Sequence, residues 1–362
     1  MDSNKLLKKL ILAPSPSGYE LPVIKVIEEF AEGFADQINL DAMNSVHVWL
    51  NGRTDLPTLM LASHIDEVGL IVKYIDDHGY VYFDSIGNVD PIAISAMPVE
   101  IHSAHGVVHG VVGRKPIHFI TEADKSNITF QKLFIDVGMS RDAAEQLISI
   151  GDAVTFQAIY SELKDCYIVG RGLDDKAGVW VSLELLRRLS ESKIPHGNIC
   201  FAGTSQEELG LRGGITSTYS INADLGVCVE VINATDYPDV DMKQYGAIYC
   251  GKGPVLGRGP NIHPLLFEYM LEAAKLTNLN YQIAAEPRAT GTDANAIQIS
   301  RGGIMAGLIS IPLRYMHTPI EMINIKDLSD AVSILLKFIE LIQENKQIVP
   351  RCCQIKHSFP HH

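Results

Sequence analysis

The amino-acid sequence predicts an α/β protein in which helices cover both faces of a sheet and a β-rich insertion interrupts the chain. Helical and strand-like segments alternate after residue 170, which is typical of a sheet covered on both faces. Short β-branched runs follow one another from residue 68 to residue 160, which favours a small barrel or sandwich. An apolar strand at residues 57–64 precedes these runs, so the β-rich stretch is predicted to be inserted into the α/β unit.

The elements before and within the insertion follow from hydrophobic spacing. Residues 6–12 and 23–34 carry apolar side chains at helical spacing. Residues 57–64 are apolar until a polar end, which predicts a buried strand that places His64 at its carboxyl end. Gly and Asp residues separate six predicted strands of the insertion, at 69–74, 80–84, 98–102, 106–113, 133–137 and 153–156.

After the insertion, segments with the hydrophobic spacing of helices alternate with segments typical of strands. The segment 251–259 is rich in glycine but lacks the spacing of a phosphate-binding loop, so we expect a loop near the site. No internal repeat or low-complexity segment is present. Helices are predicted at 178–189, 209–218, 263–276, 293–299 and 325–343, and strands or extended segments at 198–203, 224–229, 280–285 and 303–309.

Length and charge limit the function. At roughly 150 residues per domain, 362 residues favour two domains. The 43 acidic against 30 basic residues give a formal net charge of −13, which argues against binding to nucleic acid or to anionic membranes. No run reaches the roughly 18 apolar residues of a membrane-spanning helix. The six cysteines form no CxxC motif, which is typical of reduced thiols in the cytoplasm.

Five short segments place polar side chains beside predicted strands or helices. Each also has a plain structural interpretation: a surface turn, a helix cap, an acidic first helical turn, a strand end at the surface, or a structural histidine. A carboxylate next to a histidine can orient a metal-binding imidazole, and one carboxylate can bridge two cations. The candidates in these segments are His64 with Asp66, Asp174 with Asp175, Glu207 with Glu208, Glu230, and His317.

Together these segments predict a metal site at one edge of the sheet. Ligands of α/β proteins collect at the carboxyl ends of strands, where nearly all five segments lie. Imidazoles mixed with carboxylates suit Zn²⁺, Mn²⁺ or Co²⁺. The sequence lacks a GxSxG elbow, a P-loop and a GxGxxG motif after a strand. These motifs define serine hydrolases, NTPases and dinucleotide-binding enzymes, so the sequence does not indicate any of these classes.

The sequence resembles the M42 family of metallo-aminopeptidases along nearly its whole length. The resemblance implies a two-metal exopeptidase-type α/β/α sandwich with a mixed central sheet, interrupted by a β-barrel-like insertion domain. The corresponding domain prediction is a catalytic α/β domain at 1–67 and 166–345, a dimerisation insertion at 68–165, and a polar tail at 346–362. The motifs that carry the resemblance are SHIDEVGL (63–70), GLDDKAG (172–178), QEELGLRG (206–213), GTDA (291–294) and RYMHTP (314–319).

The resemblance also implies a role for each candidate residue. Asp174 bridges two divalent ions, with Zn²⁺ as the first choice and Co²⁺ or Mn²⁺ as alternatives. Glu207 is the general base that deprotonates the bridging water, and Asp66 orients the imidazole of His64. A strained or cis peptide joins Asp174 to Asp175. The implied metal ligands are His64 and Glu230 at one ion, Glu208 and His317 at the other, and Asp174 at both.

The implied function is release of N-terminal residues from peptides by a cytoplasmic homo-oligomer whose dimers assemble into a dodecamer. The family usually has Asp where this chain has Glu230, and in the wider clan Glu is commoner among carboxypeptidases and amidases. An alternative is therefore a two-metal deacylase or amidase on N-acyl amino acids or other non-peptide amides. A catalytically idle scaffold and an endoglucanase are further alternatives. Intact Glu207, Asp174 and His317 count against the scaffold, and the metal-ligand pattern does not suit a glycosidase.

Overall fold

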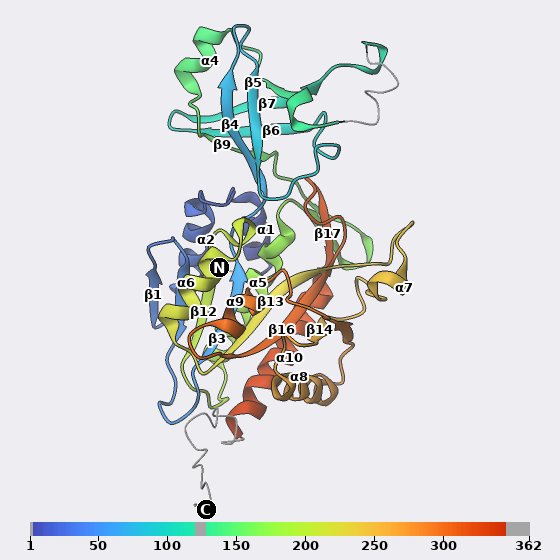
Figure 1. Ribbon diagram of the computed structural model, residues 1–362. Coiled ribbons are helices and arrows are strands. Elements are labelled where there is room, and N and C mark those ends of the chain that lie inside the picture. Colours follow the sequence, from blue (N-terminus) through green and yellow to red (C-terminus); the bar gives the residue numbers. More distant parts are fainter. Residues whose placement is uncertain (1–2, 120–127, 345–362) are drawn as a thin grey trace, which may run out of the picture.

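The structure is a computed structural model that describes residues 3–119 and 128–344. A mixed eight-stranded sheet forms its centre, and a closed barrel lies at one end of the molecule (Figure 1). The tail predicted at 346–362, with Cys352 and Cys353, lies outside the described residues. In the part of the chain that is described, no helix is both long and apolar enough to span a bilayer.

The central four strands of the large sheet are parallel. β12 (Ile199–Thr204), β3 (Leu59–His64), β13 (Leu225–Asn233) and β16 (Met305–Leu313) lie side by side in this order, so their carboxyl ends meet at one edge. Antiparallel pairing of β2 with β12 and of β14 with β16 makes the sheet mixed. The outer strands are β1 (Gln37–Leu40), β2 (Val46–Leu50), β14 (Val255–Arg258) and β15 (Gln282–Ala285).

Helices cover both faces of this sheet. A Cβ on Gly226 of β13 would meet Ile297 of α9, whereas a Cβ on Gly307 of β16 would meet Met270 of α8, so these helices lie on opposite faces. α5 packs so closely on β13 that a Cβ on Gly178 would lie 2.3 Å from the Val229 carbonyl oxygen. The helices are α1 (Ser3–Leu12), α2 (Leu21–Ala31), α5 (Leu173–Glu191), α6 (Arg212–Ile221), α7 (Met242–Tyr245), α8 (Pro264–Thr277), α9 (Asp293–Ile299) and α10 (Ile325–Glu344).

The inserted strands close into a barrel in the order β4-β5-β8-β7-β6-β9. Its interior is a separate hydrophobic core that includes Leu70, Ile101 and Ile135. The short helix α4 (Arg141–Leu147) packs against β4 at the end of the molecule that the barrel forms (Figure 1). The strands are β4 (Gly69–Ile75), β5 (Val81–Ile86), β6 (Pro98–Ser103), β7 (Gly106–Arg114), β8 (Leu133–Asp136) and β9 (Ala153–Phe156).

A three-stranded sheet follows the barrel along the chain. β10 (Tyr160–Glu162), β11 (Tyr167–Gly170) and β17 (Glu321–Asn324) pair antiparallel in this order. β11 leads into α5 and β17 leads into α10, so this sheet holds the entry to two helices of the α/β unit.

The predicted fold class is confirmed, including all six strands of the insertion. The prediction of a loop at 251–259 is wrong, because Val255–Arg258 forms β14 and pairs with both β15 and β16. The strand predicted to stop near Val229 continues to Asn233, since β16 pairs with it along this whole length. The domain boundaries at 67/68, 165/166 and 345/346 stay a prediction.

Candidate metal centre

His64 is fixed at the carboxyl end of β3. Its side chain is buried, and its Nδ1 lies 3.0 Å from the backbone carbonyl oxygen of Asp66. That contact leaves Nε2 facing Asp174 Oδ1 at 2.9 Å and Glu230 Oε1 at 3.4 Å. A ring nitrogen held by a carbonyl fixes the orientation of the other nitrogen, which is how proteins prepare an imidazole for a metal.

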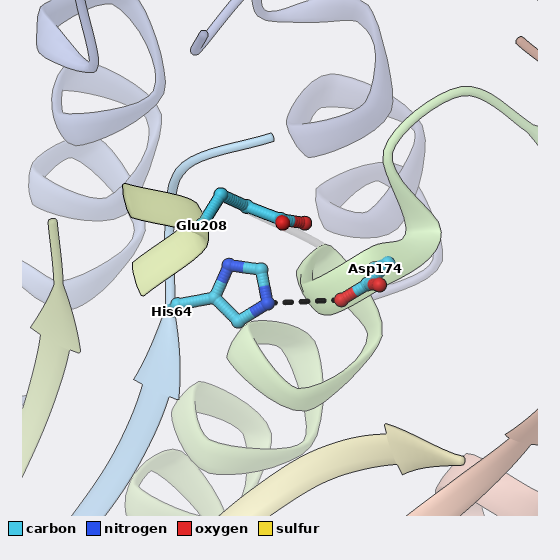
Figure 2. A group of neighbouring side chains, drawn as sticks. All are labelled: His64, Asp174 and Glu208. Atoms are coloured by element: carbon cyan, nitrogen blue, oxygen red, sulfur yellow. Dashed lines mark hydrogen bonds and ion pairs between the residues drawn. The ribbon is translucent and has the colours of Figure 1, made fainter. Parts of the chain in front are cut away.

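Asp174 lies between two imidazoles at the start of α5. Its Oδ1 faces His64, and its Oδ2 lies 3.3 Å from Nε2 of His317. Figure 2 shows His64, Asp174 and Glu208 converging from three separate elements. The peptide between Asp174 and Asp175 is cis. One carboxylate that faces two imidazoles has the arrangement needed to bridge two cations.

Glu207 and Glu208 are presented by a 3-10 turn, η4 (Glu207–Leu209), just after β12. The buried Asp66 carboxylate accepts hydrogen bonds from the backbone N–H groups of both residues, at 2.9 and 3.2 Å. Ser17 donates its hydroxyl to the same carboxylate at 2.6 Å. Asp66 Oδ1 lies 3.5 Å from the imidazole of His64, farther than these donors, so the carboxylate mainly holds the η4 turn.

His317 approaches from the segment between β16 and β17. Its Nε2 lies 3.1 Å from Glu208 Oε1, and its Nδ1 lies 3.0 Å from the carbonyl oxygen of Asn88. The carboxylate of Glu321, buried in β17, accepts the backbone N–H of Asp174 at 3.0 Å and that of His317 at 2.9 Å. Glu321 therefore ties the two sides of the site together through their main chains.

Glu230 lies inside β13, so its carboxylate is buried. One oxygen faces His64, while Oε2 has no hydrogen-bond partner among the described residues. Asp175 Oδ2 is buried and without a partner in the same part of the chain. Burying an unpaired carboxylate oxygen is costly unless a cation binds it. Two groups of side chains are placed to hold a metal ion: His64, Asp174 and Glu208, and His64, Asp175 and Glu230.

Burial and mutual contacts shift the protonation of the site. Burial opposes ionisation of Asp174, but hydrogen bonds from His317 and His64 outweigh it and lower the pKa of that carboxyl. Burial opposes charge on His317, yet contacts with Asp174 and Glu208 raise its pKa to about 11. Burial raises the pKa of Glu207 to about 10 and also raises that of Glu230. So many buried carboxylates need cations to be ionised together.

The structure brings the predicted residues to one cavity of about 300 Å³. His64, Asp174, Glu208, Glu230 and His317 line it together with Glu207. Asp66 lies behind the cavity, where it holds the η4 turn. Sequence reasoning did not single out Glu321 or Ser17, whose roles depend on hydrogen bonds across the fold. Donors of this kind, imidazole nitrogens with carboxylate oxygens, fit Zn²⁺, Co²⁺ or Mn²⁺.

Comparison with known proteins shows the family of this chain. The family model described as M42 glutamyl aminopeptidase matches residues 44–334. The chain belongs to the M42 family. The lysyl aminopeptidase of Pyrococcus furiosus is 33% identical over an alignment that covers 93% of this chain and 96% of the relative.

Solved structures of TET peptidases share the fold. The TET aminopeptidase of Thaumarchaeota archaeon SCGC AB-539-E09 superimposes with a TM-score of 0.88 at 30% identity, covering 93% of this chain and 96% of that one. The TET1 peptidase of Pyrococcus horikoshii gives 0.83 at 27% identity, with 93% and 99% covered, and can assemble into a tetrahedron or a large octahedral shell. The protein is a metal-dependent aminopeptidase, and the deacylase alternative is not favoured.

Proposed function

We propose that this aminopeptidase releases N-terminal residues from peptides with two divalent cations in the cavity. His64 and Glu230 would hold one cation, Glu208 and His317 would hold the other, and Asp174 would serve both. The position of Asp174 carries this proposal, because its two oxygens face different imidazoles at 2.9 and 3.3 Å. The partnerless oxygen of Glu230 supports a cation on its side of the site.

Zn²⁺ is the proposed metal, with Co²⁺ and Mn²⁺ as alternatives that the same donors accept. When bound, a pair of such ions polarises the scissile carbonyl and makes water acidic enough to attack at neutral pH. Glu230 in place of the Asp that is usual in the family reaches one methylene farther from β13. It still points its Oε1 at His64, which supports a ligand role.

Glu207 is the proposed general base. It lines the cavity with only 9% of its surface exposed, and burial raises the pKa of its carboxyl, so the ionised group takes up a proton readily. A carboxylate of this kind accepts a proton from the attacking water and returns it to the leaving amine. Asp66 fixes the backbone of Glu207 and Glu208, so the base and its neighbouring ligand keep their relative position.

A substrate panel tests the proposed function. Purified protein reconstituted with Zn²⁺, Co²⁺ or Mn²⁺ is assayed on aminoacyl-p-nitroanilides and on N-acyl amino acids, and bound metal is counted by elemental analysis. We expect hydrolysis of the aminoacyl set alone, two ions per chain, and loss of activity with a chelator. Hydrolysis of the N-acyl set alone would show a deacylase, and fewer than one ion per chain without turnover would show a scaffold.

We also propose a cytoplasmic homo-oligomer of twelve subunits built from dimers that use the barrel domain. The assembly of the Pyrococcus horikoshii TET1 peptidase into a tetrahedron supports this. The barrel spans β4 to β9 and projects from the α/β unit, which leaves its outer surface accessible to another subunit (Figure 1). The proposed partners are peptide substrates. We propose binding neither to nucleic acid nor to membranes.

A further inference from the structure

The cavity is larger than the metal site and has an apolar wall. Beyond the six residues assigned to the ions and to general base catalysis, its lining includes Ile232 and Leu308, which lie on the same face of the sheet as Glu230. Thr290 and Thr292 line another part, and their hydroxyl oxygens are hydrogen-bonded at 2.9 Å. The Thr290 hydroxyl also donates to Oδ1 of Asn261 at 2.7 Å. This part of the cavity can hold the side chain of a substrate residue.

Glu286 is an acidic residue in this same lining, and the fold fixes its place. It follows β15 directly, and its backbone N–H donates to the carbonyl oxygen of Arg258 at 2.8 Å. Its backbone also lies so close to Gly259 that a Cβ there would be 1.9 Å from the Glu286 carbonyl oxygen. Only glycine at position 259 allows this approach, so Glu286 is held against β14 rather than free on a loop.

The Glu286 carboxylate has no counter-charge in the part of the chain that the structure describes. Its side chain forms no ion pair or hydrogen bond there, although it is partly buried. Burial raises the pKa of Glu286, as expected for a carboxyl that has lost water without gaining a cation. Unpaired acids in a cavity are more costly than acids on the surface, which makes the group a candidate for ligand binding.

Glu286 differs from the other acids that line the cavity. Asp174, Glu208 and Glu230 are proposed to hold the cations, and Glu207 is proposed to accept the proton. Glu286 has neither task and lines the cavity together with apolar residues. A side chain with an aliphatic stem and a cationic end matches both features, and among substrate residues lysine and arginine have this form.

We propose that Glu286 binds the cationic end of an N-terminal lysine or arginine side chain and gives the enzyme a preference for basic N-terminal residues. The preference rests on the proposed function of the same site. The stem of the substrate side chain lies along Ile232 and Leu308, and its ammonium or guanidinium group reaches Glu286.

Norleucine tests the role of charge because it keeps the stem of lysine and lacks the amine. We expect kcat/KM for lysyl-p-nitroanilide to exceed that for norleucyl-p-nitroanilide by about tenfold or more, the size expected for a charged hydrogen bond. Glu286→Gln should bring the ratio close to one, and Glu286→Lys should make glutamyl-p-nitroanilide a better substrate than the lysyl compound. Glu268→Gln, an exposed change on α8, is the matched control and should keep the wild-type ratio.

A binding measurement separates this proposal from the catalytic one. Calorimetry on Glu207→Gln should show tighter binding of lysinamide than of norleucinamide, and the added change Glu286→Gln should remove the difference. The preference is overturned if the wild-type ratio is one or lower, or if Glu286→Gln leaves the ratio and the binding difference unchanged. Absence of turnover with every aminoacyl compound would instead overturn the proposed function, and the binding arm would still test Glu286.

Discussion

Two buried carboxylates, Asp66 and Glu321, act on the main chain of the site. Asp66 accepts the N–H groups of Glu207 and Glu208, and Glu321 accepts those of Asp174 and His317. Asp66 therefore positions the proposed base and the proposed ligand next to it, and Glu321 positions two proposed ligands that come from different parts of the chain. Groups that orient metal ligands in this way usually change metal affinity strongly when they are replaced.

The role of Glu207 gives the first prediction. Glu207→Gln removes the proton acceptor while keeping the size of the side chain, so kcat should fall by about 10²–10⁴-fold. Because Glu207 is not among the proposed ligands, the variant should still bind two metal ions. Steady-state kinetics with elemental analysis measures both quantities. A variant that keeps most of its kcat would show that another group accepts the proton.

Glu321 gives the second prediction. Glu321→Gln leaves one side-chain oxygen for the two N–H groups of Asp174 and His317, so one of them loses its acceptor. We expect Zn²⁺ affinity to weaken by about 10–100-fold in competition with a chelating dye. Glu32→Gln, an exposed change after α2, is the control and should bind Zn²⁺ like the wild type. Equal affinities for both variants would contradict the role given to Glu321.

The proposed metal ligands and the proposed base could be predicted from the sequence, because they lie in short motifs near strand ends. His64 is the last residue of β3, and Glu208 lies in the η4 turn that comes after β12. Glu321 could not be predicted, since it is 147 positions from Asp174 and acts only through the backbone. Glu286 was not predicted either, although it directly follows the extended segment predicted at 280–285, because its place depends on the pairing of β15 with β14.

At the level of elements, one buried ion cluster joins the start of α5 to the chain entering the barrel. Glu67 Oε2 lies 3.0 Å from Arg171 Nε and 3.1 Å from Lys176 Nζ, and all three side chains are buried. Lys176 also donates to the carbonyl oxygen of Ala13 after α1, and Arg171 donates to that of Phe156 at the end of β9. The cluster therefore connects α1 and α5 with the chain segments that enter and leave the barrel.

This cluster gives the third prediction. Glu67→Ala leaves two buried cations without their carboxylate, which should lower the free energy of unfolding by about 3–5 kcal/mol. Glu29→Ala breaks the exposed pair with Lys9, whose atoms are 2.8 Å apart, and should cost less than about 1 kcal/mol. Urea denaturation followed by circular dichroism compares the two variants. Similar losses in both would contradict the importance of the buried cluster.

Helices and strands were predicted correctly where the hydrophobic residues of a segment follow one period. The prediction failed where pairing with neighbouring strands determines whether a segment is a strand and where it ends. The six barrel strands alternate clearly, so their positions were predicted to within a few residues. β14 has only four residues and two glycines just before it, and it is a strand because β15 and β16 flank it. β13 runs past Val229 for the same reason, which places Glu230 in the interior.

At the level of the whole molecule, the barrel presents apolar side chains to its surroundings. Val107 and Val111 lie on the outward face of β7 with exposed fractions of 51% and 42%. Tyr74 on β4 is 52% exposed and contacts Tyr82. Exposed apolar residues on an element that projects from the main body are typical of a subunit interface.

The assembly gives the last prediction. If twelve subunits associate through the barrel, light scattering should give a mass twelve times the 39.8 kDa of the chain. Val107→Lys places a charge on the outer face of β7, where burial against another subunit would desolvate it, so the particle should become smaller. Leu12→Lys, an exposed change in α1 on the α/β unit, is the control and should keep the wild-type mass. Because the cavity of one chain contains every proposed ligand, the smaller Val107→Lys particle should still hydrolyse small aminoacyl substrates. A monomeric wild type, or a Val107→Lys particle of full size, would mean that the barrel does not hold the subunits together.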